Sequence, residues 1–153
     1  MKKLIFLGLF FMASHLMAKP LQMGDGYPVI QLSDQHEQAV VLNESVQMVL
    51  FAAGKSTSEL MTKTLEALPP TTLKDKKALY IADISGMPGF ITKMVAIPRM
   101  QKMPYSIGLI RDEALSQIFP KKESAITIIR WQAGKVTEIR FVTTQAEIAQ
   151  ELQ

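Results

Sequence analysis

The segment VQMVLFAAGKSTSELMTKTLEALPP, residues 46–70, decides the fold class. Its first eight residues, 46–53, form a near-continuous apolar run, which is typical of a central strand buried on both faces. Residues 57–68 then carry apolar side chains at helical spacing, and the prolines at 69 and 70 end that helix. The segment therefore predicts a buried strand, a tight turn and an amphipathic helix.

The turn itself, Gly54-Lys55-Ser56-Thr57, matches the end of a phosphate-binding loop. The complete motif is G-x-x-x-x-G-K-[ST], because the loop amides must wrap the phosphates. Its first glycine would fall at Val49, which lies inside the predicted strand. No loop is left to surround a phosphate, so we do not expect the chain to bind a nucleotide.

The rest of the chain alternates strands and helices. Further strands are predicted at residues 27–32, 39–42, 78–84, 105–110, 125–131 and 136–142. Further helices are predicted at residues 90–97, 113–119 and from Thr144 onward, where Thr144 and Glu147 fit a capping box. Pro98 is expected to end the helix at 90–97, and residues 98–104 are expected to be irregular. This order predicts an α/β fold with a central mixed sheet and an N-terminal β-hairpin.

The first eighteen residues, MKKLIFLGLFFMASHLMA, have the pattern of a signal peptide. Lys2 and Lys3 precede an apolar stretch at 4–13, which is too short to span a bilayer. Cleavage is predicted after Ala18, leaving residues 19–153 as one domain in the periplasm with no stable membrane anchor. An uncleaved N-terminal anchor is the alternative.

Composition excludes several function classes. Lys2 and Lys3 account for two of the 17 basic residues, so residues 19–153 are close to neutral against the 14 acidic ones. The sequence has no basic patch interleaved with aromatic residues, so a nucleic-acid partner is not expected. The chain has no cysteine, which rules out thiol chemistry by its own residues. His36 is the only histidine after the leader, so neither a histidine-based triad nor a zinc site can be assembled, and no cofactor is expected.

Ser56 and Glu59 have two interpretations. In the first they form a capping box at the start of the helix, in which each side chain accepts from the other residue's amide. In the second, the same exposed helix start forms part of a site for a ligand or partner. Both interpretations place these side chains at the end of a buried strand.

Several segments together resemble the thioredoxin-like superfamily, in particular its peroxiredoxin and thiol-reductase branch. They are GDGYPVIQLSD at 24–34, the strand at 46–53 with its helix, IRDEALSQIF at 110–119 and AITIIRWQAGKV at 125–136. More narrowly, AAGKSTSE at 52–59 and ESAITII at 123–129 are similar to the small exported YtfJ-type proteins. The resemblance covers most of residues 24–150 and implies a thioredoxin-like three-layer fold, with helices on both faces of the sheet.

The chain departs from this family at the redox site. The resemblance places a C-x-x-C pair at the helix start, where this chain has Ser56 and Glu59, and a cis-proline before the strand at 126–131, where it has Glu123, Ser124 and Ala125. Thiol–disulfide exchange and peroxide reduction are therefore not expected. What the resemblance implies instead is a contact surface between the helix start and this facing turn. The candidate residues are Lys55, Ser56, Thr57, Glu59, Glu123 and Ser124.

Two other hypotheses come from different residue types. Four methionines, Met87, Met94, Met100 and Met103, fall within a proline-rich stretch. Thioether sulfur suits Cu(I), but methionine also packs irregular cores and lines adaptable grooves. The copper hypothesis requires Met94, Met100 and Met103 to converge.

Asp83 ends a predicted strand at a carboxyl edge, so a hydrolase-like enzyme using Ser56, Lys55 or Asp83 is the third hypothesis. A catalytic Lys55 would have to be buried. The preferred interpretation is a non-catalytic, exported binding module whose partner is a protein or peptide in the periplasm.

Overall fold

The computed structural model describes residues 19–153; the predicted leader lies outside the described residues. At its centre is β3 (Met48–Ala52), in which all five residues are buried. Strand β4 (Ala78–Asp83) pairs with β3 in parallel, and β5 (Ile107–Ile110) pairs with β4 in parallel. These three strands form the parallel centre of the sheet, as their continuous apolar sequences predict.

Antiparallel strands flank the parallel centre on both sides. The hairpin of β1 (Gln31–Ser33) and β2 (Ala39–Val41) joins β5, and the hairpin of β6 (Ile126–Gln132) and β7 (Lys135–Val142) joins β3. The seven-stranded order is β2-β1-β5-β4-β3-β6-β7. The predicted mixed sheet with an N-terminal hairpin is confirmed.

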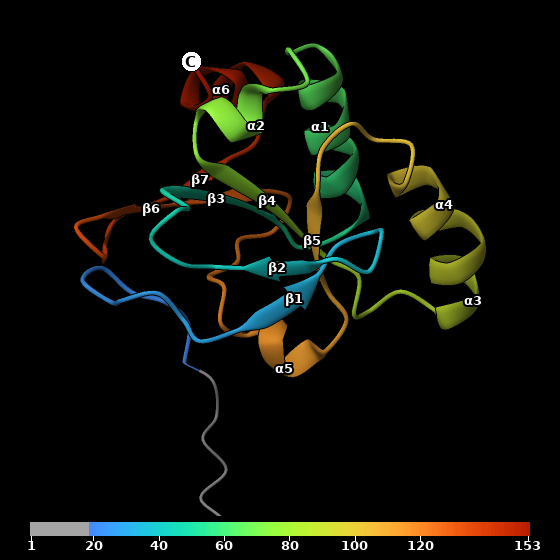
Figure 1. Cartoon of the computed structure of the whole chain (residues 1–153), viewed down its shortest axis with the longest axis horizontal. Coiled ribbons are helices and arrows are strands. Elements are labelled where there is room, and N and C mark those ends of the chain that lie inside the picture. Colours follow the sequence, from blue (N-terminus) through green and yellow to red (C-terminus); the bar gives the residue numbers. More distant parts are fainter. Residues whose placement is uncertain (1–18) are drawn as a thin grey trace, which may run out of the picture.

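Helices cover both faces of this sheet (Figure 1). One face carries α1 (Lys55–Glu66), α2 (Thr72–Asp75) and α6 (Gln145–Glu151), whose apolar side chains pack against β3, β4, β5 and β6. The other face carries α5 (Glu113–Ser116) and the lead-in from Leu21, with Phe51 and Phe119 stacked at a centroid distance of 4.8 Å. The structure therefore has three layers.

The C-terminal end of the chain has a predicted helix cap and a tight hairpin turn. Thr144 and Glu147 form the expected capping box of α6. The β6–β7 turn has positive φ at Ala133 (50°) and Gly134 (75°), the geometry of a type I′ hairpin. Glycine adopts such angles without strain, so Gly134 suits the second position of this turn.

The prediction that Pro98 ends a helix at 90–97 is wrong. Helical structure runs from α3 (Gly89–Ile91) through the π-helical turn η1 (Thr92–Ala96) into α4 (Ile97–Met100), where Pro98 lies in the first turn. Proline lacks an N–H, but a first-turn amide needs no intrahelical partner. The π-helical turn η1 comes directly before the proline, and in it the Ile97 amide donates to the carbonyl of Thr92.

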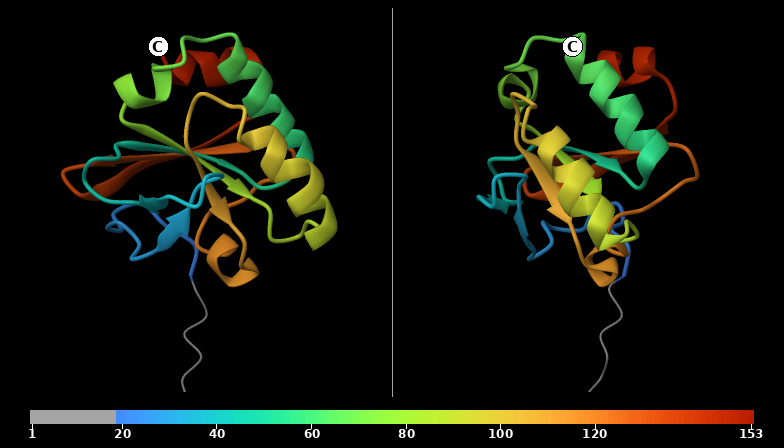
Figure 2. Two further views of the ribbon diagram at one scale, coloured as in Figure 1. Left: turned by 45° about the vertical axis from the view of Figure 1, so that its right-hand side comes forward. Right: turned by 90° about the vertical axis from the view of Figure 1, so that its right-hand side faces the viewer.

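This helical segment, α3–α4, lies beside α1 at one side of the molecule (Figure 2). Buried Gln35, in the β1–β2 turn, helps to hold it there. The Gln35 side chain donates to the carbonyls of Tyr105 (2.7 Å) and Met100 (3.3 Å) and accepts from the amide of Ile107 (2.9 Å). These bonds fix the chain between α4 and β5 against the hairpin.

Candidate functional site

The start of α1 differs from the predicted capping box. The helix begins at Lys55 with Gly54 as its N-cap, and the amide of Ser58 makes the first intrahelical bond, to the Gly54 carbonyl at 2.9 Å. No side chain caps this end. Ser56 is therefore inside the first turn rather than before it, and Glu59 pairs with Lys55 at 4.0 Å instead of reaching back to an amide. Glycine can occupy an N-cap without offering a side-chain acceptor.

A groove of about 850 Å³ opens between α1 and α3–α4. It gathers residues that follow all three parallel strands: Gly54 after β3, Ile84 after β4 and Ser116 after β5. In open α/β sheets, ligands bind in the crevice beyond the carboxyl ends of the strands. The groove extends from that crevice along the sheet toward Met103.

Apolar side chains form much of the groove. Its walls and floor include Tyr80, Met87, Ile91, Val95, Met100, Met103 and Ile107. Burial raises the pKa of Tyr80, so its hydroxyl remains neutral in the floor. Such a lining provides apolar area for side chains of an occupant, and methionines adapt to their shape.

The predicted contact residues divide between the groove and the surrounding surface. Lys55 and Glu59 line the groove, whereas Thr57 is buried and donates from its hydroxyl to the Gly54 carbonyl at 2.9 Å. Ser56 is exposed but outside the lining.

Across the groove, Glu123 and Ser124 are also exposed and outside the lining. From this turn it is Lys121 that lines the groove. Ser124 has a positive φ of 56°. In the described residues every peptide bond is trans.

Asp83 organises the polar end of the groove. Its carboxylate accepts from the Ser85 amide (2.9 Å) and hydroxyl (2.6 Å), and from the hydroxyl of buried Ser116, and it pairs with Lys121 at 3.7 Å. Burial opposes ionisation, yet the bonds from Ser116 and Ser85 and the charge of Lys121 together lower the pKa of Asp83. The group is a fixed anion that ties the ends of β4, α5 and the turn at 121 together.

This geometry gives little support to the hydrolase hypothesis. The Lys55 side chain is 87% exposed, whereas a catalytic lysine would need burial. Ser56 lies outside the groove that Lys55 and Asp83 line. The lowered pKa of Asp83 makes its carboxylate a weak base, which does not favour a role as general base.

The methionines are only partly gathered. Met87, Met100 and Met103 line the groove, but Met94 is 65% exposed and lies outside the lining. The convergence of Met94 with Met100 and Met103 that the copper hypothesis requires is therefore not seen. Residues 19–153 also contain no cluster of three or more histidine, aspartate or glutamate side chains able to hold a metal ion.

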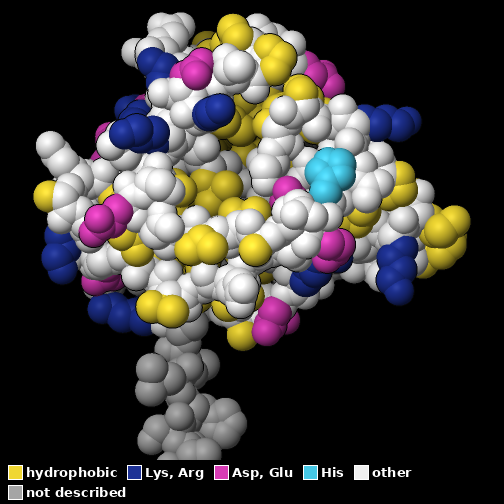
Figure 3. Space-filling view, in the orientation of Figure 1, with side chains coloured by type: hydrophobic (Ala, Val, Ile, Leu, Met, Phe, Trp, Pro, Cys, Tyr) yellow, Lys and Arg dark blue, Asp and Glu magenta, His cyan; other side chains and the backbone are white. Residues whose placement is uncertain are grey.

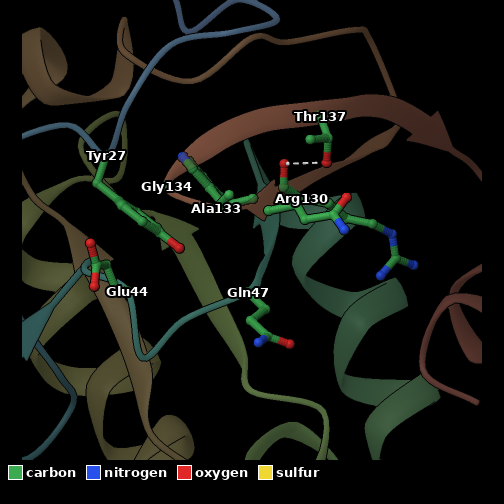
Figure 4. A pocket seen from close by; sticks show the side chains of 9 residues that line it. Tyr27, Glu44, Gln47, Arg130, Ala133, Gly134 and Thr137 are labelled. Atoms are coloured by element: carbon green, nitrogen blue, oxygen red, sulfur yellow. Dashed lines mark hydrogen bonds between the residues drawn. The ribbon is translucent and has the colours of Figure 1, made fainter.

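A second hollow, of about 550 Å³, lies at the opposite end of β3. It is lined by Tyr27, Glu44, Gln47 and the β6–β7 hairpin (Figure 4). The Arg130 guanidinium turns away from Tyr27 and Glu44 in this view and pairs with Glu138 (2.8 Å) and Glu151 (2.5 Å). Tyr27 in turn donates to the Val46 carbonyl at 2.7 Å. The Arg130 and Tyr27 side chains of this hollow are thus engaged within the protein.

No protein family and no curated protein matches the sequence. Solved structures do match the fold. The thioredoxin domain of a thiol-disulfide oxidoreductase from Bacteroides vulgatus aligns over 87% of this chain and 99% of its own, with a TM-score of 0.52 and 15% identity. A peroxiredoxin-like protein from Aquifex aeolicus covers 89% of this chain and 88% of its own (TM-score 0.52, 12% identity). A thiol peroxidase from Chromobacterium violaceum covers 90% and 89% (TM-score 0.53, 12% identity).

The fold is therefore thioredoxin-like, as the sequence resemblance implies. The matched proteins are named for thiol and peroxide chemistry, whereas this chain contains no cysteine. The absence is consistent with a thioredoxin-like protein that does not carry out that chemistry.

The sequence predicted the strand, turn and helix that form one side of the groove, but it did not predict most of the groove. Its far wall comes from residues 84–103, which the sequence predicts as a turn, a short helix and an irregular stretch. The available signal was the concentration of methionines, which also suits an adaptable groove.

Among residues 19–153, no helix is both long and apolar enough to cross a bilayer.

Proposed function

We propose that the protein is an exported, non-catalytic binding module that holds an extended peptide segment of a periplasmic protein in the groove between α1 and α3–α4. The observation that carries this proposal is the groove itself, which combines an apolar lining with charged residues from several elements. A YtfJ-like exported protein is the narrower form of the same proposal, and it rests on the resemblance of residues 52–59 and 123–129.

The shape and chemistry of the groove favour a peptide over a small metabolite. Metabolite sites usually provide several polar groups that converge on the ligand. Here Asp83 is already engaged by Ser85, Ser116 and Lys121. This carboxylate at the strand ends is therefore held within the protein, whereas the apolar walls can accept the side chains of an extended chain.

Charged residues at the rim of the groove would orient a bound peptide. Lys55 and Glu59 on α1, Arg99 on α4 and Glu113 on α5 all line the groove. Because exposed charges contribute more to register and association rate than to affinity, we expect moderate affinity and dependence on salt.

Binding to an immobilised library of extended peptides tests the proposal. Ala96 lines the groove and is partly exposed, so Ala96→Trp should fill part of it. Ala114 is exposed on α5 outside the lining, which makes Ala114→Trp the matched control. We expect selective peptide binding that Ala96→Trp weakens by about tenfold or more and Ala114→Trp leaves within about twofold. Absence of binding, or equal loss in both variants, would overturn the proposal.

A second candidate is a Cu(I) site with a different set of thioether ligands, in which Met87 replaces Met94, because Met87, Met100 and Met103 share the groove lining. It predicts that Cu(I) binding is lost in M100L/M103L and kept in M23L/M94L, whose methionines lie outside the groove. Leucine conserves the volume of methionine, so the groove should remain folded in both variants. Equal Cu(I) binding by both variants would refute this candidate.

A further inference from the structure

Exposed apolar side chains concentrate on α3 and η1. Eight large hydrophobic residues are exposed within the described part of the chain, and four of them fall in one six-residue run. These four are Phe90 (71%), Ile91 (40%), Met94 (65%) and Val95 (55%), and they define the apolar crest. In Figure 3, hydrophobic side chains project at the right-hand edge, where Figure 1 places α3 and α4.

The crest is a continuous helical surface that extends beyond the groove. Phe90 and Met94 are four residues apart, as are Ile91 and Val95, and residues at this spacing are neighbours on a helix. Ile91 and Val95 form part of the groove wall, whereas Phe90 and Met94 do not line it. The two most exposed members are therefore not accounted for by the proposed peptide site.

Along the chain, the charged residues next to the crest all have one sign. Between Asp83 and Asp112 the sequence contains no acidic residue, while α3–α4 and the following turn carry Lys93, Arg99 and Lys102. None of these three takes part in the ion pairs found among residues 19–153. Lys and Arg side chains appear beside the hydrophobic projection in Figure 3.

We propose that the apolar crest and its flanking cations dock the protein reversibly on the surface of a membrane rich in anionic phospholipid. A helix with bulky apolar residues on one side and Lys or Arg around them lies in the interface between headgroups and acyl chains. Phe90 and Met94 would enter that interface, and Lys93, Arg99 and Lys102 would contact lipid phosphates. The binding is peripheral and needs no spanning helix.

The position of Lys93 favours a lipid surface over a protein partner. It lies within the run of crest residues, between Ile91 and Met94. Lysine is depleted from the cores of protein interfaces because its charge would have to be desolvated. At a membrane, its long aliphatic stem can follow the apolar layer while the ammonium group remains among the headgroups.

Co-sedimentation of the full chain with phosphatidylglycerol-containing vesicles tests the proposal, with pure phosphatidylcholine vesicles as the comparison. Every variant keeps the same N-terminus, so residues 1–18 contribute equally. We expect F90S/M94S and K93E/K102E each to weaken binding to the anionic vesicles by about tenfold. Two control variants match these changes elsewhere on the surface. M23S/V29S replaces two other exposed apolar residues, and K63E/K74E makes the same change in net charge as K93E/K102E. Vesicle binding by both controls should stay within about twofold of the wild type.

Hydrogen exchange measured with and without the anionic vesicles locates the contact. The account predicts added protection at residues 89–102. Protection confined to other segments, or equal weakening by the control variants, would overturn it. So would a self-associated form that F90S/M94S dissociates while vesicle binding is absent, since that outcome would assign the crest to a second copy of this chain.

Discussion

Replacing Asp83 should destabilise the fold at the polar end of the groove. The side chain is 10% exposed and accepts hydrogen bonds from Ser85 and from fully buried Ser116. A hydrogen bond to a charged group contributes about 1.5–3 kcal/mol, and a buried donor left without an acceptor costs about 1–3 kcal/mol more. Asp83→Ala should therefore lower the free energy of unfolding by about 3–5 kcal/mol near pH 7, because it leaves the Ser116 hydroxyl without its acceptor.

Asp83→Asn tests the contribution of the charge on Asp83 separately from that of its hydrogen bonds. The amide oxygen can still accept from Ser85, but the charge opposite Lys121 is lost, so we expect a cost of about 1–2 kcal/mol near pH 7. Because folding lowers the pKa of Asp83, its ionised form stabilises the protein above the ordinary aspartate pKa. That contribution is lost as the pH falls through the folded-state pKa, so the difference between wild type and Asp83→Asn should shrink below about pH 4.

Urea unfolding followed by the fluorescence of Trp131, the sole tryptophan, measures both effects. The indole is 4% exposed and stacks on Tyr27 at 5.0 Å, so its emission should change on unfolding. An Asp83→Ala cost below about 1 kcal/mol, or an Asp83→Asn difference that stays constant from pH 7 to about pH 3, would refute this account of the carboxylate.

Three further substitutions test how the groove and its helices are held, each by urea unfolding. Ser56→Ala should change the free energy of unfolding by less than about 0.5 kcal/mol, since Ser56 is not a cap, and a cost near 1 kcal/mol would restore the capping box. Thr144→Ala should cost about 1 kcal/mol because it removes the acceptor for the Glu147 amide, and no cost would contradict that cap. Gln35→Ala should cost about 2–4 kcal/mol by leaving the Ile107 amide and Tyr105 carbonyl unpaired, and a cost below 1 kcal/mol would show that water replaces the side chain.

The parallel centre of the sheet could be predicted because its evidence is local. Residues 46–53 and 78–84 are continuous apolar runs, and they form the buried strands β3 and β4. The Thr144 cap could also be predicted, because both members of the box lie within four residues. Periodicity and capping each require only neighbouring residues.

The groove could not be predicted in the same way, because long-range contacts place its far wall. Gln35 fixes residues 100–107 through bonds that span more than sixty positions of sequence. The start of α1 was misplaced because its N-cap, Gly54, has no side chain to mark it. Pro98 suggested a helix end, but the π-helical turn at 92–96 lets it begin α4 instead.

Photo-crosslinking in living cells tests the central claim most directly. A photo-reactive residue at position 58 would lie in the groove, and one at position 74 would lie on α2, outside its lining. The account predicts discrete adducts from position 58, with mass spectrometry locating them on extended segments of periplasmic proteins, and none from position 74. A folded, abundant protein that gives no adduct at position 58, or the same adducts at both positions, would contradict the claim that this groove is a binding site.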